Sequence, residues 1–97
     1  PAAHMMAVQV FASKEEKGAQ LASYLASLTG RAFGIQILGP APAAIGKVND
    51  IFRFVFYVKS PEYDKLIRIK DCVEGKIQDL QLSGETVQFD FDPMNTL

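Results

Sequence analysis

The chain has 97 residues, which is enough to bury one hydrophobic core but too few for a catalytic core built from several domains. Hydrophobic residues make up 48% and charged residues 22%, proportions that are typical of a folded domain and that exclude a disordered tail. Ten basic and eleven acidic side chains give a formal net charge of −1, so any binding to nucleic acid must be local.

The single cysteine, Cys72, excludes an internal disulfide, and one histidine, His4, adds too little to build a metal centre. We expect both to be ordinary structural or solvated residues in a reducing, cytoplasmic compartment. No stretch reaches the length of a membrane span, so we expect no membrane contact. The chain begins with Pro1 rather than methionine, which suggests a segment of a longer protein.

The first predicted elements are a strand and a helix. Met5 to Ala12 is an apolar run with alternating valines, which is typical of a buried strand. Ser13 and Glu16 have the spacing of a capping box, which predicts that a helix begins there, and Gly30 is predicted to end it. The apolar stripe of this helix consists of Leu21, Ala22, Leu25 and Leu28.

Two strands are predicted in the middle of the chain. Residues 33–38 alternate in polarity and run into Gly39-Pro40-Ala41-Pro42, where prolines without amide hydrogens should end the strand. Residues 43–50 are then predicted to form a loop. Ile51 to Lys59 is rich in aromatic and β-branched residues and gives the strongest strand signal of the chain.

A second helix and a last strand complete the predicted elements. Ser60-Pro61-Glu62 supplies an N-cap, a proline and an acid for a helix start, and Gly75 inside this helix suggests a close approach to a neighbour. Ser83-Gly84 predicts a turn before an alternating strand, residues 85–92. The helix stripe is Leu66, Ile69, Val73, Ile77 and Leu80, and the core side of the strand is Val87, Phe89 and Phe91.

The order β-α-β-β-α-β predicts an α+β fold of the ferredoxin-like type, a four-stranded antiparallel sheet with two helices on one face. This fold hosts many unrelated activities, so side chains must decide the function. The sequence contains no phosphate-binding glycine loop, no GxSxG or HExxH motif and no paired cysteines. Asp90 and Asp92 are predicted to share one strand face, and two acids are too few to predict a metal site.

The aromatic row Phe52, Phe54 and Phe56 raises the possibility of base stacking on this strand. Exposing these rings would force Arg53 beneath the helices, and burying an unpaired guanidinium is costly. We therefore expect the phenylalanines to point inward and to leave an open sheet face that carries Arg53, Val55, Tyr57 and Lys59.

Charge is unevenly distributed along the chain. Residues 17–59 carry five basic side chains against Asp50 alone, a balance of +4, and residues 60–97 have a balance of −4. A patch that contacts phosphates explains the basic half, and an ordinary solvated surface explains it equally well.

Several stretches in order resemble the C-terminal domain of primosomal protein N′, the replication-restart helicase family called PriA. The stretches are residues 1–4 before an apolar strand, residues 37–43 (ILGPAPA), Phe52-Arg53-Phe54, Lys59-Ser60-Pro61 and residues 89–93 (FDFDP). The resemblance covers essentially the whole chain, residues 1–97, as one accessory domain of a larger helicase chain.

The resemblance implies a fold similar to the NusE-type small-subunit ribosomal protein and a role in recognising branched DNA for primosome assembly. It also implies that ATP and zinc belong to other parts of the parent helicase, so that this segment binds without catalysis and holds no cofactor. Tyr63 stands where some relatives carry an arginine that helps to hold the acidic tail of single-stranded DNA-binding protein, and Lys59 or Lys65 is expected to substitute.

Two functions remain open. In the first, the chain binds branched or single-stranded DNA through phosphate contacts, with Tyr57 stacking; the predicted residues are Lys47, Arg53, Lys59, Arg31 and Tyr57. In the second, it docks on the helicase core or on single-stranded DNA-binding protein without touching DNA, through Pro40, Pro42 and Lys65.

Overall fold

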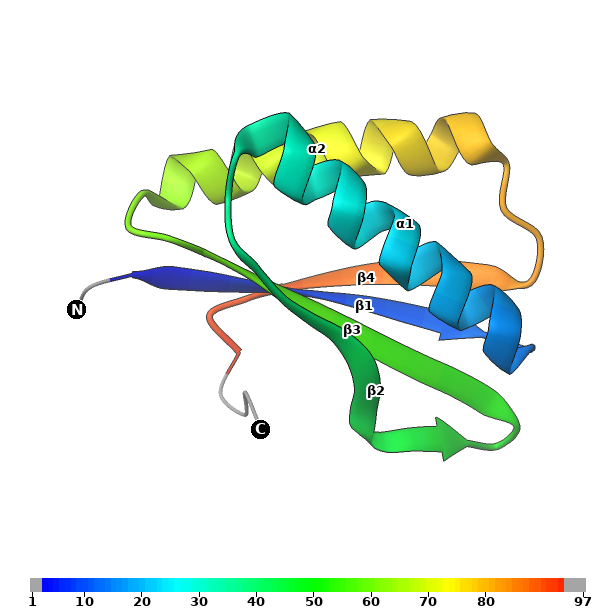
Figure 1. The fold of residues 1–97 in the computed structure, drawn as a ribbon. Helices are drawn as coiled ribbons and strands as arrows, with labels where there is room; N and C mark the ends of the chain where they lie inside the picture. The colour runs from blue at the N-terminus through cyan, green and yellow to red at the C-terminus, as the bar shows by residue number, and fades with distance from the viewer. Residues whose placement is uncertain (1–2, 94–97) are drawn as a thin grey trace.

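The computed structural model describes residues 3–93 of the chain. A four-stranded sheet with the order β2-β3-β1-β4 forms one layer, and both helices lie on one of its faces (Figure 1). The elements are β1 (His4–Ala12), α1 (Glu15–Phe33), β2 (Ile37–Val48), β3 (Ile51–Ser60), α2 (Tyr63–Leu80) and β4 (Glu85–Phe91). All neighbouring strands are antiparallel, so the predicted ferredoxin-like α+β fold is confirmed. Neither helix is long and apolar enough to cross a membrane, within the residues described.

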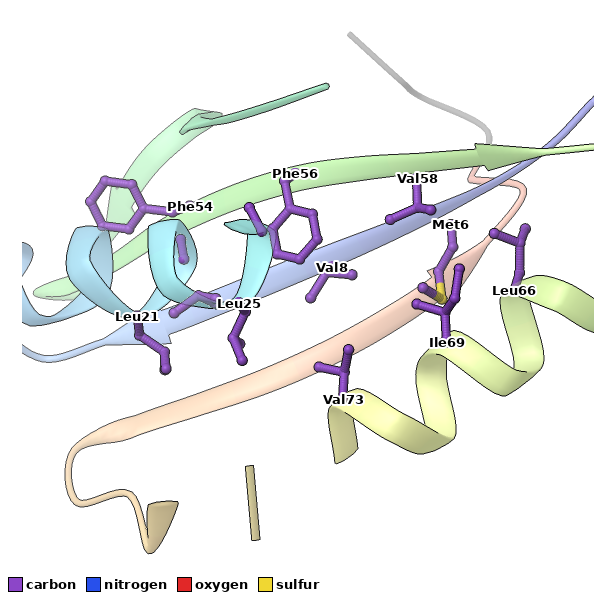
Figure 2. Packing of buried hydrophobic residues seen from close by; sticks show 13 residues of the cluster. Met6, Val8, Leu21, Leu25, Phe54, Phe56, Val58, Leu66, Ile69 and Val73 are labelled. Carbon is purple, nitrogen blue, oxygen red and sulfur yellow. The ribbon is translucent and has the colours of Figure 1, made fainter. Parts of the chain in front are cut away.

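The core lies between the sheet and the two helices. Val8 of the central strand β1 pairs with Phe56 on one side and Phe89 on the other, so alternate residues of three strands face the helices. Figure 2 shows the side chains of β1 and β3, among them Val8 and Phe56, meeting the helix stripes. The buried cluster is Met6, Val8, Val10, Leu21, Ala22, Leu25, Ala26, Phe54, Phe56, Val58, Leu66, Ile69 and Val73. Both predicted helix stripes are therefore largely confirmed, although Leu80 is exposed.

The predicted ends of α1 are wrong at both termini. The helix begins at Glu15, and the N-cap residue Lys14 makes no side-chain capping bond. The backbone N–H of Ser13 instead donates to the carbonyl oxygen of Gly84, which ties the end of β1 to the turn before β4. Gly30 lies inside the helix, which ends only at the left-handed Gly34, because packing on the sheet outweighs the cost of about 1 kcal/mol for an internal glycine.

The predicted end of the second strand at the two prolines is also wrong. β2 runs through Pro40 and Pro42 and includes most of the segment that we expected to be a loop. This is possible because β2 is an edge strand, where a residue without an amide hydrogen need not break the pairing with β3. Register shifts follow Leu38 and Pro42, and the strand bends there. We call residues 43–48 the β2 arm; Figure 1 shows the arm running below the sheet, on the side away from the helices.

The second helix begins at Tyr63, and its N-cap Glu62 makes no side-chain capping bond. Ser60 is the last residue of β3, and its hydroxyl accepts a hydrogen bond of 3.0 Å from the backbone N–H of Glu62, so it stabilises the turn rather than capping the helix. The predicted close approach at Gly75 is wrong, since nothing lies within 4 Å of a Cβ placed there. The close approach is at Gly18, where such a Cβ would lie 2.8 Å from Cε1 of Phe54.

Candidate nucleic-acid interface

The sheet face that carries no helix holds most of the residues predicted to bind DNA. Directly paired residues of neighbouring strands lie on the same face of a sheet. The register therefore places alternate side chains of β1, β3 and β4 on the face without helices. We call this the open face; it is formed by Met5, Ala7, Gln9 and Phe11 of β1, Arg53, Val55, Tyr57 and Lys59 of β3, and Thr86, Gln88 and Asp90 of β4.

The orientation of β3 agrees with the prediction. Phe54 is 7% exposed and Phe56 is 0% exposed, both beneath the helices, whereas Arg53 lies on the open face and Lys59 is exposed. This arrangement buries the aromatic rings and leaves the guanidinium in contact with solvent, which avoids the desolvation cost of an unpaired buried cation.

The open face is less open than the sequence suggested. Val55 points away from the helices and is still only 7% exposed. The reason is that the β2 arm lies along one side of this face and the segment after β4, up to Pro93, lies along the other (Figure 1). The face is therefore a trough between two ridges.

Three hollows that share lining residues occupy this trough. The central hollow has a volume of about 550 Å³ and is lined by Ala7, Gln9, Ala43, Ala44, Arg53, Val55, Tyr57 and Pro93. The outer hollow, of about 340 Å³, is lined by Met5, Leu38, Gly39, Ala41, Pro42, Val55, Tyr57 and Lys59. The arm hollow, of about 260 Å³, is lined by Phe11, Ile45, Val48, Ile51 and Arg53. Val55 and Tyr57 line both the central hollow and the outer hollow.

Charge is divided across the trough. The cations Arg53 and Lys59 project from β3, and Asp90 projects from β4 on the far side of β1. Nε2 of Gln9 donates a hydrogen bond of 2.6 Å to Oδ2 of Asp90. A polyanion therefore meets attraction on the β3 side and repulsion on the β4 side.

The Asp92 side chain, just after β4, is hydrogen-bonded to the start of β1 at one end of the sheet. Its carboxylate accepts hydrogen bonds from the backbone N–H of Met5 at 2.8 Å and from Nδ1 of His4 at 2.9 Å. The hydrogen bond from Met5 has the larger effect and that from His4 the smaller, and together they hold the pKa of Asp92 below its ordinary value of 3.8. The His4 ring also lies edge-on to Tyr63, with ring centroids 5.3 Å apart. This cluster joins the start of β1 to the end of β4, so Asp92 stabilises the sheet.

Two predicted DNA-binding residues lie away from the trough. Lys47 pairs with Phe52 and thus shares the face of the helices; its Nζ lies 4.9 Å from the Phe52 ring centroid and 3.6 Å from Oδ1 of Asp50. Arg31 is exposed in the last turn of α1, in the helix layer. The structure therefore brings together Arg53, Tyr57 and Lys59, and it separates them from Lys47 and Arg31.

The predicted partner-binding residues are divided between two regions. Pro42 lines the outer hollow together with Tyr57 and Lys59, and Pro40 is half-buried in β2. Lys65 lies in the helix layer, where it lines a separate hollow of about 400 Å³ at the start of α2, and Arg68 lines the same hollow. Arg68 was not among the predicted residues, although its spacing of three from Lys65 places both on one side of the helix.

Sequence reasoning placed five residues of the central hollow neither on the open face nor in a binding role: Ala7, Gln9, Ala43, Ala44 and Pro93. Ala7 and Gln9 alternate with the core valines of β1, so their face could have been deduced from the period of two. Ala43 and Ala44 could not have been found in this way, because the segment was predicted to be a loop and only the bent β2 arm brings it over the sheet.

Comparison with known proteins gives similar solved structures and a family. A solved structure described as "De novo designed protein Foldit4" is similar with a TM-score of 0.67 and 12% sequence identity, over 96% of this chain and 99% of that one. This likeness shows the fold alone. No curated protein matches the chain. The family model described as "Primosomal protein N C-terminal domain" matches residues 1–94, and the chain therefore belongs to that family.

Proposed function

We propose that the chain is an accessory DNA-binding domain that binds branched or single-stranded DNA through Arg53, Tyr57 and Lys59. Membership in the primosomal family supports a role in replication restart, with DNA and primosome proteins as partners. The observation that carries the proposal is the position of these three residues on one face of β3, along connected hollows, with Val55 between Arg53 and Tyr57. Alternate residues of a strand lie about 7 Å apart, so the three side chains form a row.

The row supplies the contacts that a DNA strand needs. The Arg53 guanidinium offers paired donors to phosphate oxygens, and Lys59 offers a compact positive charge. The Tyr57 ring between them offers a surface for base stacking. Contacts of this kind position DNA without reading its sequence, so we expect recognition of structure rather than of a base sequence.

Lys47 and Arg31 contribute less in this proposal. Lys47 already contacts Asp50 and the Phe52 ring, and both cations project away from the trough. We expect them to add at most a long-range attraction that salt screens within about 10 Å at 0.1 M.

Fluorescence anisotropy with a labelled forked DNA tests the proposal. With two to three phosphate contacts, the slope of log affinity against log salt concentration should be about −2 to −3, and Arg53→Ala should make it shallower by about 0.7–0.9. Arg68→Ala and Lys17→Ala remove the same charge from exposed positions of the helix layer and serve as matched controls. Equal affinity and slope in Arg53→Ala and the wild type would refute the proposal.

A second function, docking on another protein, is supported by the β2 arm. Ile45 is 62% exposed and Val48 is 54% exposed, and both line the arm hollow beside Phe11. Adjacent large apolar side chains in solvent are typical of protein interaction surfaces. Docking on the rest of a helicase chain would bury this arm together with Pro40 and Pro42. Cross-linking of the whole helicase that leaves the arm unprotected would argue against it.

A further inference from the structure

We infer that the central hollow is a binding site for one unpaired DNA base, with the phosphates along β3 and the base directed across β1 toward Gln9 and Asp90. This inference rests on the proposed DNA-binding function, and it adds a place for the base and a direction for the strand. It is carried by the small floor of the hollow, its aromatic wall, its polar edge and the division of charge across the face.

The floor of the hollow leaves room for a flat ring. Ala7 lies between Tyr57 and Asp90 in the paired strands, is 3% exposed at the bottom of the hollow, and carries only a methyl group. Ala43 and Ala44 of the β2 arm line the hollow with equally small side chains. A volume of about 550 Å³ is within the range of small-ligand sites, about 300–1,000 Å³.

The walls fit a base better than a phosphate. Tyr57 from β3 provides an aromatic ring, and Pro93 after β4 provides an apolar surface on the other side. Stacking on an aromatic ring tolerates any base, because each base has a π-face. No backbone phosphate gains from these two walls.

The polar edge of the hollow offers hydrogen-bond acceptors. The 2.6 Å bond from Nε2 of Gln9 to Oδ2 of Asp90 fixes the amide, and no side-chain donor among the described residues bonds to Oε1 of Gln9. An amide oxygen accepts from the exocyclic amino groups of adenine, cytosine and guanine, whereas thymine offers only its ring N3–H. We therefore expect thymine to bind less tightly than cytosine.

The division of charge sets the direction of the strand. Asp90 disfavours a phosphate near β4, and Arg53 and Lys59 favour phosphates near β3. The sugar-phosphate chain then follows β3, and the base of a bound nucleotide extends over Ala7 toward β4. Asp90, which repels the phosphates, also holds the amide of Gln9, whose Oε1 atom accepts from the base.

The test compares two five-nucleotide single strands with the same number of phosphates, an oligo-dC and a strand with abasic residues throughout. Anisotropy titrations of the wild-type chain should give about tenfold weaker binding to the abasic strand, since one stacked base is lost. Ala7→Leu fills the floor of the hollow and should lower the affinity for oligo-dC to that for the abasic strand. Thermal melting of Ala7→Leu followed by circular dichroism shows whether the fold is retained, and Tyr57→Ala provides a second variant that removes the wall.

The outcomes separate this inference from the proposed function. Equal affinity of the wild type for both strands refutes the base site, and the proposed function survives if Arg53→Ala weakens binding to both. If Arg53→Ala binds both strands as tightly as the wild type, the proposed function fails and the inference fails with it. A preference for oligo-dC over the abasic strand that disappears in both Ala7→Leu and Tyr57→Ala supports the base site; a preference that persists in both places the base elsewhere and refutes it.

Discussion

Replacing Gly18 with alanine should destabilise the domain, although alanine is the better helix former. A Cβ at this position would lie 2.8 Å from Cε1 of Phe54 and 2.9 Å from Cβ of Ala12. Carbon atoms pack best at about 3.5–4.0 Å, so α1 must move away from the sheet by up to about 1 Å or the Phe54 ring must rotate. Overpacking of this kind costs about 1–3 kcal/mol, and the gain in helix propensity returns about 1 kcal/mol.

The net loss expected for Gly18→Ala is therefore about 1 kcal/mol, which lowers the melting temperature of a domain of this size by about 4–8 °C. Gly75→Ala is a matched control in the other helix, since nothing lies within 4 Å of its Cβ, and it should raise the stability by about 1 kcal/mol. Urea denaturation of both variants and the wild type measures the free energies of unfolding. The reasoning is refuted if Gly18→Ala is at least as stable as Gly75→Ala.

Three further predictions concern the core, acid stability and the β2 arm. Phe56→Ala should lower the free energy of unfolding by about 3–5 kcal/mol, because the ring is fully buried; a loss below 1 kcal/mol in urea denaturation would contradict the packing described. Because folding depresses the pKa of Asp92, its hydrogen bonds stabilise the protein above the ordinary value of 3.8, and this stabilisation is lost as the pH falls through the lower folded-state pKa. Asp92→Asn should therefore reduce the loss of stability in acid, measured by urea denaturation between about pH 2 and 5, and an unchanged dependence of stability on pH would count against this role of Asp92. Ile45→Ser adds no charge to the trough and should change stability by less than about 0.5 kcal/mol and leave DNA affinity nearly unchanged, since the side chain projects into solvent; a collapse of the fold on thermal melting would show that the arm supports the core.

The sequence predicted the fold and the orientation of β3 for a clear physical reason. In a half-buried strand, the alternate positions must divide between core and solvent, and the phenylalanines and Arg53 cannot exchange faces without burying a charge. The element order then left few ways to connect the strands, and the ferredoxin-like arrangement is the one observed.

The boundaries were less predictable, because local rules allow several answers that packing decides. Gly30 and Gly34 are both suitable helix ends, and only the contact of α1 with the sheet selects the second. Pro40 and Pro42 are incompatible with a central strand but not with an edge, and the position of β2 in the sheet depends on pairing with β3.

The site was predictable only along β3. The sequence placed Arg53, Tyr57 and Lys59 together, because they share one strand face. Lys47 was grouped with them by charge, and the register shift after Pro42 places it on the opposite face. The bond between Gln9 and Asp90 joins residues far apart in the chain, so it requires the strand register that the sequence alone does not give.

The two prolines of β2 also affect whether two copies of this domain can associate through their sheet edges. A free sheet edge offers a row of amide hydrogens and carbonyl oxygens on which another strand can assemble, and this is a common start of aggregation. Pro40 and Pro42 remove two of those amide hydrogens, and the bend into the β2 arm prevents a long straight edge. β2 is therefore a poor template for a second sheet, and this edge can expose an apolar arm to partners while resisting pairing with the strand of another copy.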